Sequence, residues 1–236
     1  MKKKLNEKVL AIIPARSGSK RIKNKNIKNF FGKPFIYYAI NVAKKARIFD
    51  NIVVSTDTLK ISNIAKKYGA EVPFLRSKKL SNDKADTISV INNCILNLEK
   101  KKRFFKYTCC IYPANPFLKT SNLKKALKFI KLDDKIEYVF TATKYNHPIE
   151  RSFKLSNDGF FEKKNKNLNM RTQDIIDSYH DGAQFYFSKT LNWKKKKKIF
   201  SRKSKPIILS EIECQDIDNP IDIKIAKLKF KLKKRK

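Results

Sequence analysis

The sequence predicts an α/β protein built around a doubly wound, mostly parallel sheet. Continuous apolar runs, such as 9–13 and the Ile-Val-Val inside 51–55, have the composition of strands that are buried on both faces of a sheet. Segments with apolar residues at helical spacing alternate with these runs, as in the stretch 85–99. The chain has 236 residues, of which 41% are hydrophobic, and this is enough for one three-layer αβα domain with a modest insertion.

The expected elements follow one another in regular order over the first 143 residues. Pro34 is tolerated at the start of a helix, and Gly69 suits the end of one. The expected strands are 9–13, 51–55, 72–75, 107–112 and 137–143, and the expected helices are 34–46, 58–68, 85–99 and 121–131. Right-handed crossovers would bring loops 15–29, 55–57 and 113–120 to the carboxyl edge of the sheet, where open α/β sheets bind ligands.

The pattern loosens over residues 144–195, where we expect a small antiparallel insertion. Short alternating pieces flank Asn157-Asp158-Gly159, which is typical of a hairpin turn, and a further strand is expected at 183–187. Regular structure returns with a strand at 206–209 and a terminal helix from about 220. We therefore treat 1–236 as a single domain with an insertion at about 144–195.

The composition is strongly basic, with 56 Lys and Arg against 21 Asp and Glu and a formal net charge of +35. Such a charge could serve nucleic-acid or anionic-membrane binding. The basic residues are spread along the whole chain, most are Lys, and no nucleic-acid recognition motif accompanies them. We therefore interpret the charge as a general compositional bias and expect neither a specific nucleic-acid partner nor a membrane partner.

The four cysteines indicate neither a zinc site nor a disulfide framework. Cys94, Cys109, Cys110 and Cys214 form no C-x-x-C pair, and no Cys/His spacing fits zinc. We expect ordinary reduced thiols in the core. No run of 18 apolar residues is present, so we expect no transmembrane helix and a cytoplasmic location.

A basic loop with one glycine directly follows the first expected strand. Gly18 permits a tight backbone, and the small residues Ser17 and Ser19 leave amide N–H groups accessible. The cations that could bind phosphates beside these amides are Arg16, Lys20 or Arg21, and Lys25. The spacing is that of neither the P-loop nor the G-x-G-x-x-G fingerprint. The loop therefore predicts a polyphosphate cradle of another kind, and the alternative is a basic surface loop.

Two carboxylates are spaced to face one site near the end of the chain. In the extended segment Asp216-Ile217-Asp218, residues i and i+2 point to the same side while Ile217 faces the core. Two hard oxygen ligands can hold Mg²⁺ and leave room for substrate phosphates and water. The alternative is structural, because Asp218 or Asn219 could simply cap the helix that follows Pro220.

Two further segments are candidates for binding. Ser55-Thr56-Asp57 ends a buried strand, although Asp57 could instead cap the next helix. The segments 171–174 and 179–186 combine a cation, amides, an imidazole and aromatic rings, as carbohydrate recognition often requires. His180 is one of only two histidines and lies beside Asp181, but a structural role for it remains the alternative.

Together these segments resemble the acylneuraminate cytidylyltransferase family, the CMP-sialic acid synthetases. The family's opening pattern P-A-R-x-G-S-K-x-[IL]-x-x-K-N is matched in full by residues 14–26. Its S-T-D, G-A-E-V-P-F-x-R and D-I-D-x-P-x-D patterns are matched by 55–57, 69–76 and 216–222, in the same order. The resemblance spans nearly the whole chain, and its first motif is highly specific.

The resemblance implies a Rossmann-like nucleotide-diphospho-sugar transferase fold, a dimerisation insertion and a homodimer. It implies a nucleotidyltransferase that moves CMP from CTP to a nine-carbon acidic sugar with Mg²⁺ as cofactor. The implied CTP contacts are Ala15, Arg16, Ser17, Gly18, Ser19, Asn26, Arg76 and Thr87. The implied catalytic residues are Arg16, Lys20, Lys25, Asp216 and Asp218, and the last two would hold Mg²⁺. The expected sugar contacts are Tyr112, Arg171, Gln173, Tyr179, His180 and Gln184.

Within the family, the sequence departs from the sialic acid branch. That branch has Gln at the position of Tyr112 and Y-x-x-N-G-A where this chain has Tyr179-His180-Asp181-Gly182-Ala183. Segments 109–112, 171–174 and 179–186 look like the pseudaminic acid cytidylyltransferases, although 113–115 differ from that branch's usual A-T-A-P-F. Pseudaminic acid is the expected acceptor, and N-acetylneuraminic acid or another nonulosonic or 3-deoxy-ulosonic acid is the alternative. The general base stays open between Asp216, a metal-bound hydroxide and His180.

Overall fold

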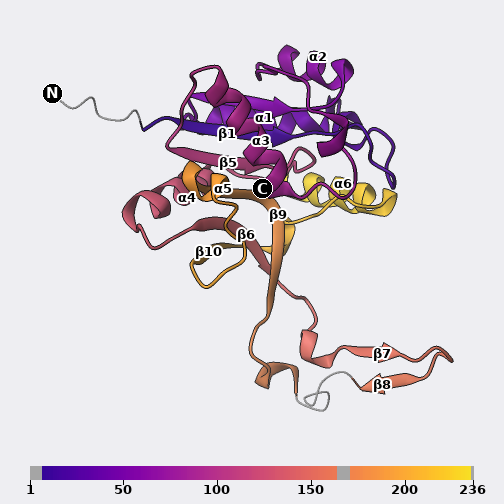
Figure 1. Cartoon of the computed structure of the whole chain (residues 1–236). Coiled ribbons are helices and arrows are strands. Elements are labelled where there is room, and N and C mark those ends of the chain that lie inside the picture. The colour runs from indigo at the N-terminus through magenta and orange to yellow at the C-terminus, as the bar shows by residue number, and fades with distance from the viewer. Residues whose placement is uncertain (1–6, 164–170, 235–236) are drawn as a thin grey trace.

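A computed structural model of the chain describes residues 7–163 and 171–234, and Figure 1 shows its arrangement. Its centre is a six-stranded sheet in the order β10-β6-β9-β5-β1-β4. The strands are β1 (Val9–Pro14), β4 (Asn51–Ser55), β5 (Tyr107–Ile111), β6 (Tyr138–Lys144), β9 (Tyr179–Lys189) and β10 (Ser204–Leu209). Neighbouring strands run parallel except where β9 lies antiparallel between β5 and β6. The prediction of a mostly parallel α/β sheet is confirmed.

Helices cover both faces of the sheet and give it three layers. The helices are α1 (Phe35–Ala46), α2 (Leu59–Lys67), α3 (Thr87–Lys100), α4 (Thr120–Leu132), α5 (Thr190–Lys194) and α6 (Pro220–Lys234). Val9, Ala11 and Ile13 of β1 pack with α1, α2 and α4, whereas Leu10 and Ile12 pack with α3 and α5. Successive strand side chains point to opposite faces, so a continuous apolar run is what a strand between two helical layers requires.

The expected strand at 72–75 is wrong. Only Glu71 pairs there, as an isolated parallel bridge to Val53 at the edge of the sheet. Pro73 has no backbone N–H to donate, so the segment cannot continue a regular ladder. The other predicted strands and helices are present, with ends shifted by a few residues and with the strand expected at 183–187 extended in both directions.

A third apolar cluster lies beside the carboxyl edge of the sheet. It joins Ile22 and Phe30 of the basic loop region to Ile217 and to Ile223 of α6. Phe30 is fully buried and belongs to a small hairpin of β2 (Asn29–Phe30) and β3 (Lys33–Pro34). Segments far apart in the sequence, the basic loop and the acidic pair, are therefore packed against one another by apolar contacts.

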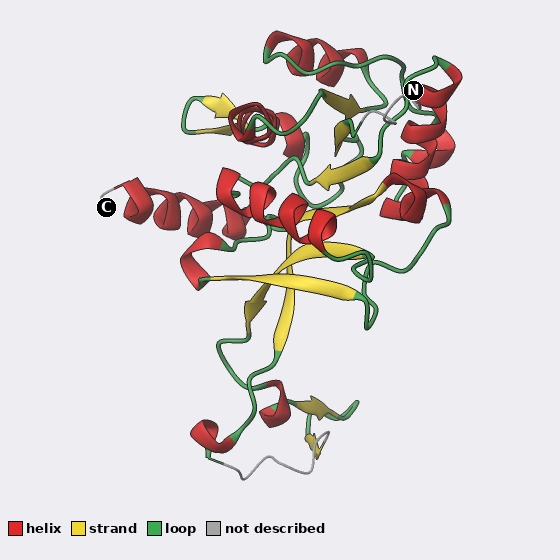
Figure 2. Cartoon of the chain, turned by 90° about the vertical axis from the view of Figure 1, so that its left-hand side faces the viewer, coloured by secondary structure: helices red, strands yellow, loops and turns green. Residues whose placement is uncertain are grey.

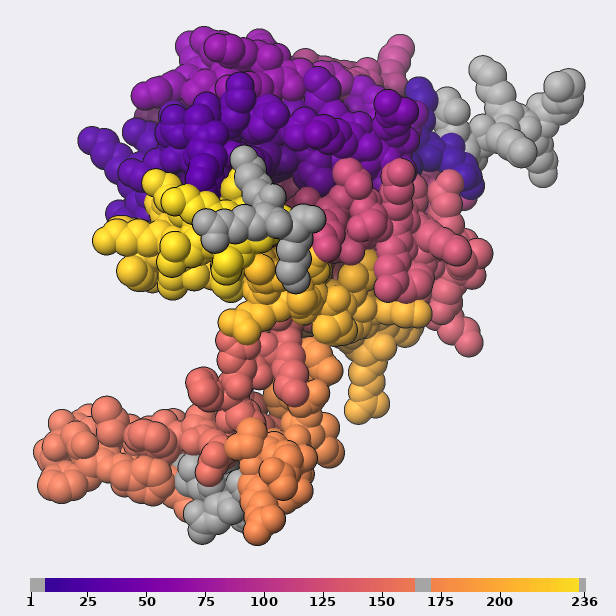
Figure 3. All heavy atoms as spheres, turned by 180° about the vertical axis from the view of Figure 1, so that it is seen from behind, coloured from indigo at the N-terminus to yellow at the C-terminus, as the bar shows by residue number. Residues whose placement is uncertain are grey.

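An arm projects from the body between β6 and β9 (Figures 1 and 2). It carries the antiparallel hairpin of β7 (Phe153–Leu155) and β8 (Phe161–Lys163), and Gly159 takes a positive φ of 82° in the connecting turn. Seen from behind, a narrow neck joins the arm to the body (Figure 3). Of the expected insertion at 144–195, residues 145–163 and 171–178 make this arm, whereas β9 and α5 belong to the central sheet and its cover.

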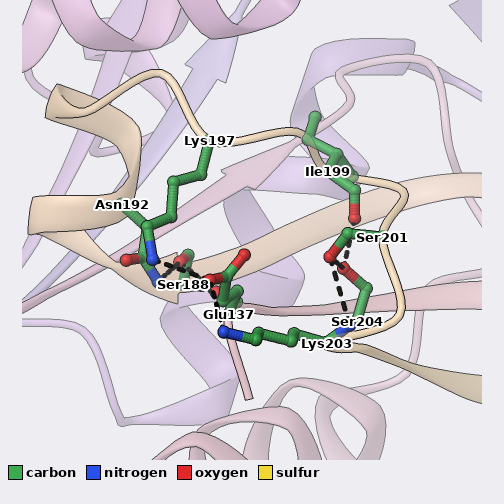
Figure 4. Close-up of polar contacts among 8 residues, drawn as sticks. All are labelled: Glu137, Ser188, Asn192, Lys197, Ile199, Ser201, Lys203 and Ser204. Carbon is green, nitrogen blue, oxygen red and sulfur yellow. Dashed lines mark hydrogen bonds and ion pairs between the residues drawn. The ribbon is translucent and has the colours of Figure 1, made fainter. Parts of the chain in front are cut away.

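The connection from α5 to β10 is fastened to the start of β6 (Figure 4). Lys197 Nζ lies 2.7 Å from Glu137 Oε1, and the Glu137 backbone N–H donates to the Lys203 carbonyl at 2.8 Å. The Glu137 carbonyl accepts from Asn192 Nδ2 at 3.0 Å and from the Ser188 hydroxyl.

Within residues 7–163 and 171–234, no helix is long and apolar enough to cross a bilayer.

Candidate active site

The basic loop after β1 is held in place by Asp57. The Asp57 carboxylate accepts from the Ser17 backbone N–H at 2.8 Å and from the Ser17 hydroxyl at 2.7 Å. The alternative that Asp57 caps α2 is wrong, because Thr58 occupies that position and its Oγ1 accepts from Ile61 N at 3.4 Å. Asp57, which follows β4, therefore fixes the loop that follows the neighbouring strand β1.

Asn26 and Lys25 close the same loop from its far end. Asn26 is buried and its amide donates to the Arg16 carbonyl at 2.9 Å. Lys25 Nζ donates to the Ile217 carbonyl at 2.6 Å and lies 3.5 Å from Asp218 Oδ1. A left-handed backbone at Asn24, with φ of 57°, makes the turn that brings the two side chains inward. Lys25 thus joins the basic loop to the acidic pair.

A hollow of about 520 Å³ opens above this loop at the carboxyl edge of the sheet. The residues that line it and that the sequence predicted as functional are Arg16, Ser19, Lys20, Arg21, Lys25, Asn26, Arg76, Thr87, Tyr112 and Asp218. Three predicted loop residues do not line it: Ala15 is fully buried and bonded to β4, Ser17 is bonded to Asp57, and Gly18 lies in the loop. We call this space the basic hollow.

Two further hollows, of about 330 and 620 Å³, lie on the other side of the acidic pair. The smaller is lined by Tyr112, Tyr186 and Asp181, and the larger by His147, His180 and Asp181, among others. Asp216 lines both of these hollows, and Asp218 lines all three. We call these two further spaces together the acceptor hollow. Asp218 lies where the acceptor hollow meets the basic hollow.

The acidic pair does not cap α6. Asp222, the third residue of α6, instead reaches back, and its Oδ2 accepts from the backbone N–H groups of Asp218 at 2.8 Å and Asn219 at 2.6 Å, as the inner residue of a capping box does. The Asp218 carboxylate is left to face Arg21 at 2.9 Å and Lys25 at 3.5 Å. Burial raises the pKa of Asp216, and the neighbouring Asp218 carboxylate raises it further.

The donor set of this pair suits a hard divalent cation. Among the described residues, no three Asp, Glu, His or Cys side chains gather as a metal-binding group. Two carboxylates that repel one another beside a hollow lined by cations nevertheless suit Mg²⁺, because this ion retains waters and takes substrate oxygens as its other ligands. Asp216 and Asp218 therefore fit the predicted ion.

Cations of the basic hollow are held in pairs and by burial. The Asp83 carboxylate, which the sequence did not predict to be part of the site, forms ion pairs with Arg16 Nη1 and with Lys20 Nζ, each at 2.6 Å. Arg76 is only 5% exposed, its Nε donates to Ser81 Oγ at 3.1 Å, and desolvation lowers its pKa. Asp83 had no local signal in the sequence, because its partners lie more than 60 positions away.

The expected sugar contacts divide into two groups. Tyr112 and His180 line the acceptor hollow, and the Tyr112 hydroxyl lies 2.9 Å from Thr87 Oγ1. Burial raises the pKa of Tyr112 to about 12, so this side chain stays neutral.

The remaining four expected sugar contacts, Arg171, Gln173, Tyr179 and Gln184, do not line the acceptor hollow. Gln184 is fully buried and its amide donates to the Glu213 carbonyl at 2.7 Å. Tyr179 is exposed at the start of β9, and Arg171 and Gln173 belong to the arm. Sequence proximity had grouped them with His180. Strand alternation turns Tyr179 to the opposite face, and the register shift within β9 separates Gln184 from His180. Arg171 and Gln173 are separated because the arm projects from the body (Figure 1).

The α/β fold and a basic hollow that meets a carboxylate pair define the class of the protein, an α/β nucleotidyltransferase. Residues 10–229 match the family model described as cytidylyltransferase, and the chain belongs to the cytidylyltransferase family.

Relatives cover the chain almost completely. It is 40% identical over 227 residues to the pseudaminic acid cytidylyltransferase of Campylobacter jejuni subsp. jejuni serotype O:2, covering 95% of this chain and 97% of that one. It is 30% identical over 220 residues to the CMP-N,N'-diacetyllegionaminic acid synthase of Legionella pneumophila, covering 91% and 93%. The solved structure of CMP:2-keto-3-deoxy-manno-octonic acid synthetase complexed with CTP aligns with a TM-score of 0.71 at 12% identity, covering 96% and 99%. At this identity the last comparison shows the fold alone.

Proposed function

We propose that this chain transfers CMP from CTP to pseudaminic acid and releases pyrophosphate. The observation that carries the proposal is the junction at Lys25 and Asp218, where the basic hollow meets the acceptor hollow. A nucleotide in the first hollow and an acidic sugar in the second would meet there. The 40% identical relative from Campylobacter jejuni, named a pseudaminic acid cytidylyltransferase, supports this choice of sugar.

In the proposed reaction the anomeric hydroxyl of the sugar attacks the α-phosphorus of CTP. A sugar O–P bond forms, the bond from the α-phosphorus to the bridging oxygen breaks, and pyrophosphate leaves. Arg16, Lys20 and Lys25 would supply fixed positive charge for the phosphates and the leaving group. Asp216 and Asp218 would hold Mg²⁺, which when bound neutralises charge on phosphate oxygens. The hydroxyl proton leaves toward the acceptor hollow, where Asp216 and His180 are the candidate acceptors.

We also propose that two copies associate through the arm, which would bring Arg171 and Gln173 toward the acceptor hollow of the other copy. Large apolar side chains exposed on the arm support this, since a monomer in water gains nothing from exposing them. They are Phe153, Leu155, Phe160, Phe161 and Ile176. Light scattering after size exclusion tests the association.

The proposed use of CTP also bears on location. Because CTP is a nucleotide of the cytoplasmic pool, its use as a substrate implies a cytoplasmic location.

The experiment is pyrophosphate release with CTP and Mg²⁺, comparing pseudaminic acid with N-acetylneuraminic acid and N,N'-diacetyllegionaminic acid. A clear preference in kcat/KM for pseudaminic acid is expected. A preference for either other sugar would retain the reaction and overturn the choice of acceptor. Release with none of the three, by a chain that still binds CTP in calorimetry, would overturn the proposed activity.

A further inference from the structure

β9 is irregular where it passes β6 beside the acceptor hollow. The register of the two strands shifts between Phe140 and Ala142, and Ala183 on β9 takes a positive φ of 48°. Gly182 is packed so closely that a Cβ there would come within 3.0 Å of Thr141 Oγ1 and 3.2 Å of the Thr141 carbonyl. Positive φ at a residue with a side chain costs free energy and persists where the surroundings enforce it. Bulges of this kind re-aim side chains next to binding sites.

The side chain that this bulge presents to the hollow is Asp181, which lines both of its parts. One carboxylate oxygen accepts from the Ala183 backbone N–H at 3.0 Å, and the other accepts from the Tyr186 hydroxyl. Both donors are neutral and both hold the carboxylate in one orientation. Each oxygen of a carboxylate has a second acceptor position, so Asp181 can still accept from a ligand.

Tyr186 connects this carboxylate to the nucleotide side of the site. Its ring meets Tyr112 edge to face, with centroids 5.5 Å apart and planes at 83°. The Tyr112 hydroxyl in turn bonds Thr87, which lines the basic hollow. Burial, with Tyr112 and Asp181 as close neighbours, holds the pKa of Tyr186 far above its usual value, so its hydroxyl remains a donor to Asp181.

We propose that Asp181 is a binding residue for the acceptor sugar, which receives a hydrogen bond from an N–H or O–H group of that sugar, and that Tyr186 is its positioning residue. This inference rests on the proposed function. The two donors fix the orientation of the Asp181 carboxylate, and its remaining acceptor positions face the hollow. Asp181 therefore contributes to recognition of the sugar.

The test measures KM for the sugar and kcat at saturating CTP in full-length variants. Asp181→Asn keeps the shape, removes the charge and turns a donor toward the ligand, so KM for the sugar should rise roughly 10- to 100-fold with kcat changed less than about threefold. Tyr186→Phe should raise the same KM by about threefold, since it frees the carboxylate without removing it. The Kd for CTP, measured by calorimetry, should stay unchanged in both, which also shows that they fold. Asp134→Asn, the same change at a side chain 92% exposed, is the matched control.

An unchanged KM for the sugar in Asp181→Asn would overturn the inference. So would a loss of kcat of more than about 100-fold at unchanged KM, together with loss of the acidic limb of the kcat–pH profile, because that pattern identifies a proton acceptor. The series is run with whichever sugar the unaltered chain accepts. Failure of the unaltered chain on pseudaminic acid therefore counts against the proposed function, and the KM ratio still decides the role of Asp181.

Discussion

The carboxylate of Asp57 accepts both the backbone N–H and the hydroxyl of Ser17, which lies 40 positions earlier in the chain. These two bonds, at 2.8 and 2.7 Å, fix the first turn of the basic loop to the end of β4. The loop that would bind phosphates is therefore shaped before any nucleotide arrives, so less conformational freedom is lost on binding.

Asp57→Asn should weaken CTP binding by about tenfold with the fold retained. The substituted amide can still accept from the Ser17 N–H and can donate to the Ser17 hydroxyl, so the loss is that of the carboxylate's charge-assisted bonds, about 1 to 2 kcal/mol in total. Calorimetric titration with CTP measures the effect. Ser17→Ala removes only the hydroxyl bond and should cause a smaller loss, and equal affinity in all three proteins would contradict this role for Asp57.

Asp83→Asn should do the opposite and tighten the binding of CTP and of pyrophosphate, by about threefold in low salt. Asp83 occupies Arg16 and Lys20 as a phosphate would, so an incoming triphosphate must displace it. Inhibition by inorganic pyrophosphate provides the readout. The gain should shrink at higher ionic strength, because these pairs are exposed and salt screens them. Weaker binding in the variant would mean that Asp83 orders the loop instead.

Asp218→Asn should lower kcat by roughly 100-fold or more with the fold intact. The substitution removes one of the two charges proposed to hold Mg²⁺ and leaves Lys25 with the Ile217 carbonyl but without the Asp218 carboxylate. Turnover measured over a range of Mg²⁺ concentrations checks this, and near-normal turnover at saturating Mg²⁺ would rule out the metal assignment.

Asp222→Asn is the companion variant. It should cost about 1 kcal/mol of folding stability through the start of α6, with a smaller effect on turnover.

Glu137→Gln should lower the free energy of unfolding by about 1 to 2 kcal/mol without affecting turnover. Glu137 is half-buried beside Lys197 at the start of β6 (Figure 4). The acceptor hollow is lined by Thr143 and Lys144, at the opposite end of the strand. Urea denaturation measures the loss. Lys203→Gln is a useful comparison, because Lys203 Nζ lies 3.9 Å from the carboxylate and should contribute less. An equal loss in both variants would assign the effect to surface charge in general.

The sequence by itself determined the alternation of strands and helices and the nature of the two charged segments. Buried parallel strands and amphipathic helices have local signatures, and so does an i, i+2 carboxylate pair such as Asp216 and Asp218. The basic loop at 14–26 was likewise identified from adjacent residues, and its Arg16, Lys20 and Lys25 side chains do line the hollow that begins at the end of β1.

Tertiary structure decided the contacts that connect these segments. Three such contacts depend on packing across the sheet edge. Asp57 binds Ser17, and Asp83 binds Arg16. Lys25 reaches the Ile217 carbonyl, which lies 192 positions away. The separation of Gln184 from His180 has the same origin, whereas the missing strand at 72–75 has a local cause in Pro73. The periodicity of apolar residues predicts which face of each segment is buried. Hydrogen-bond partners depend on which groups lie within about 3 Å of one another, and only the packed core determines this.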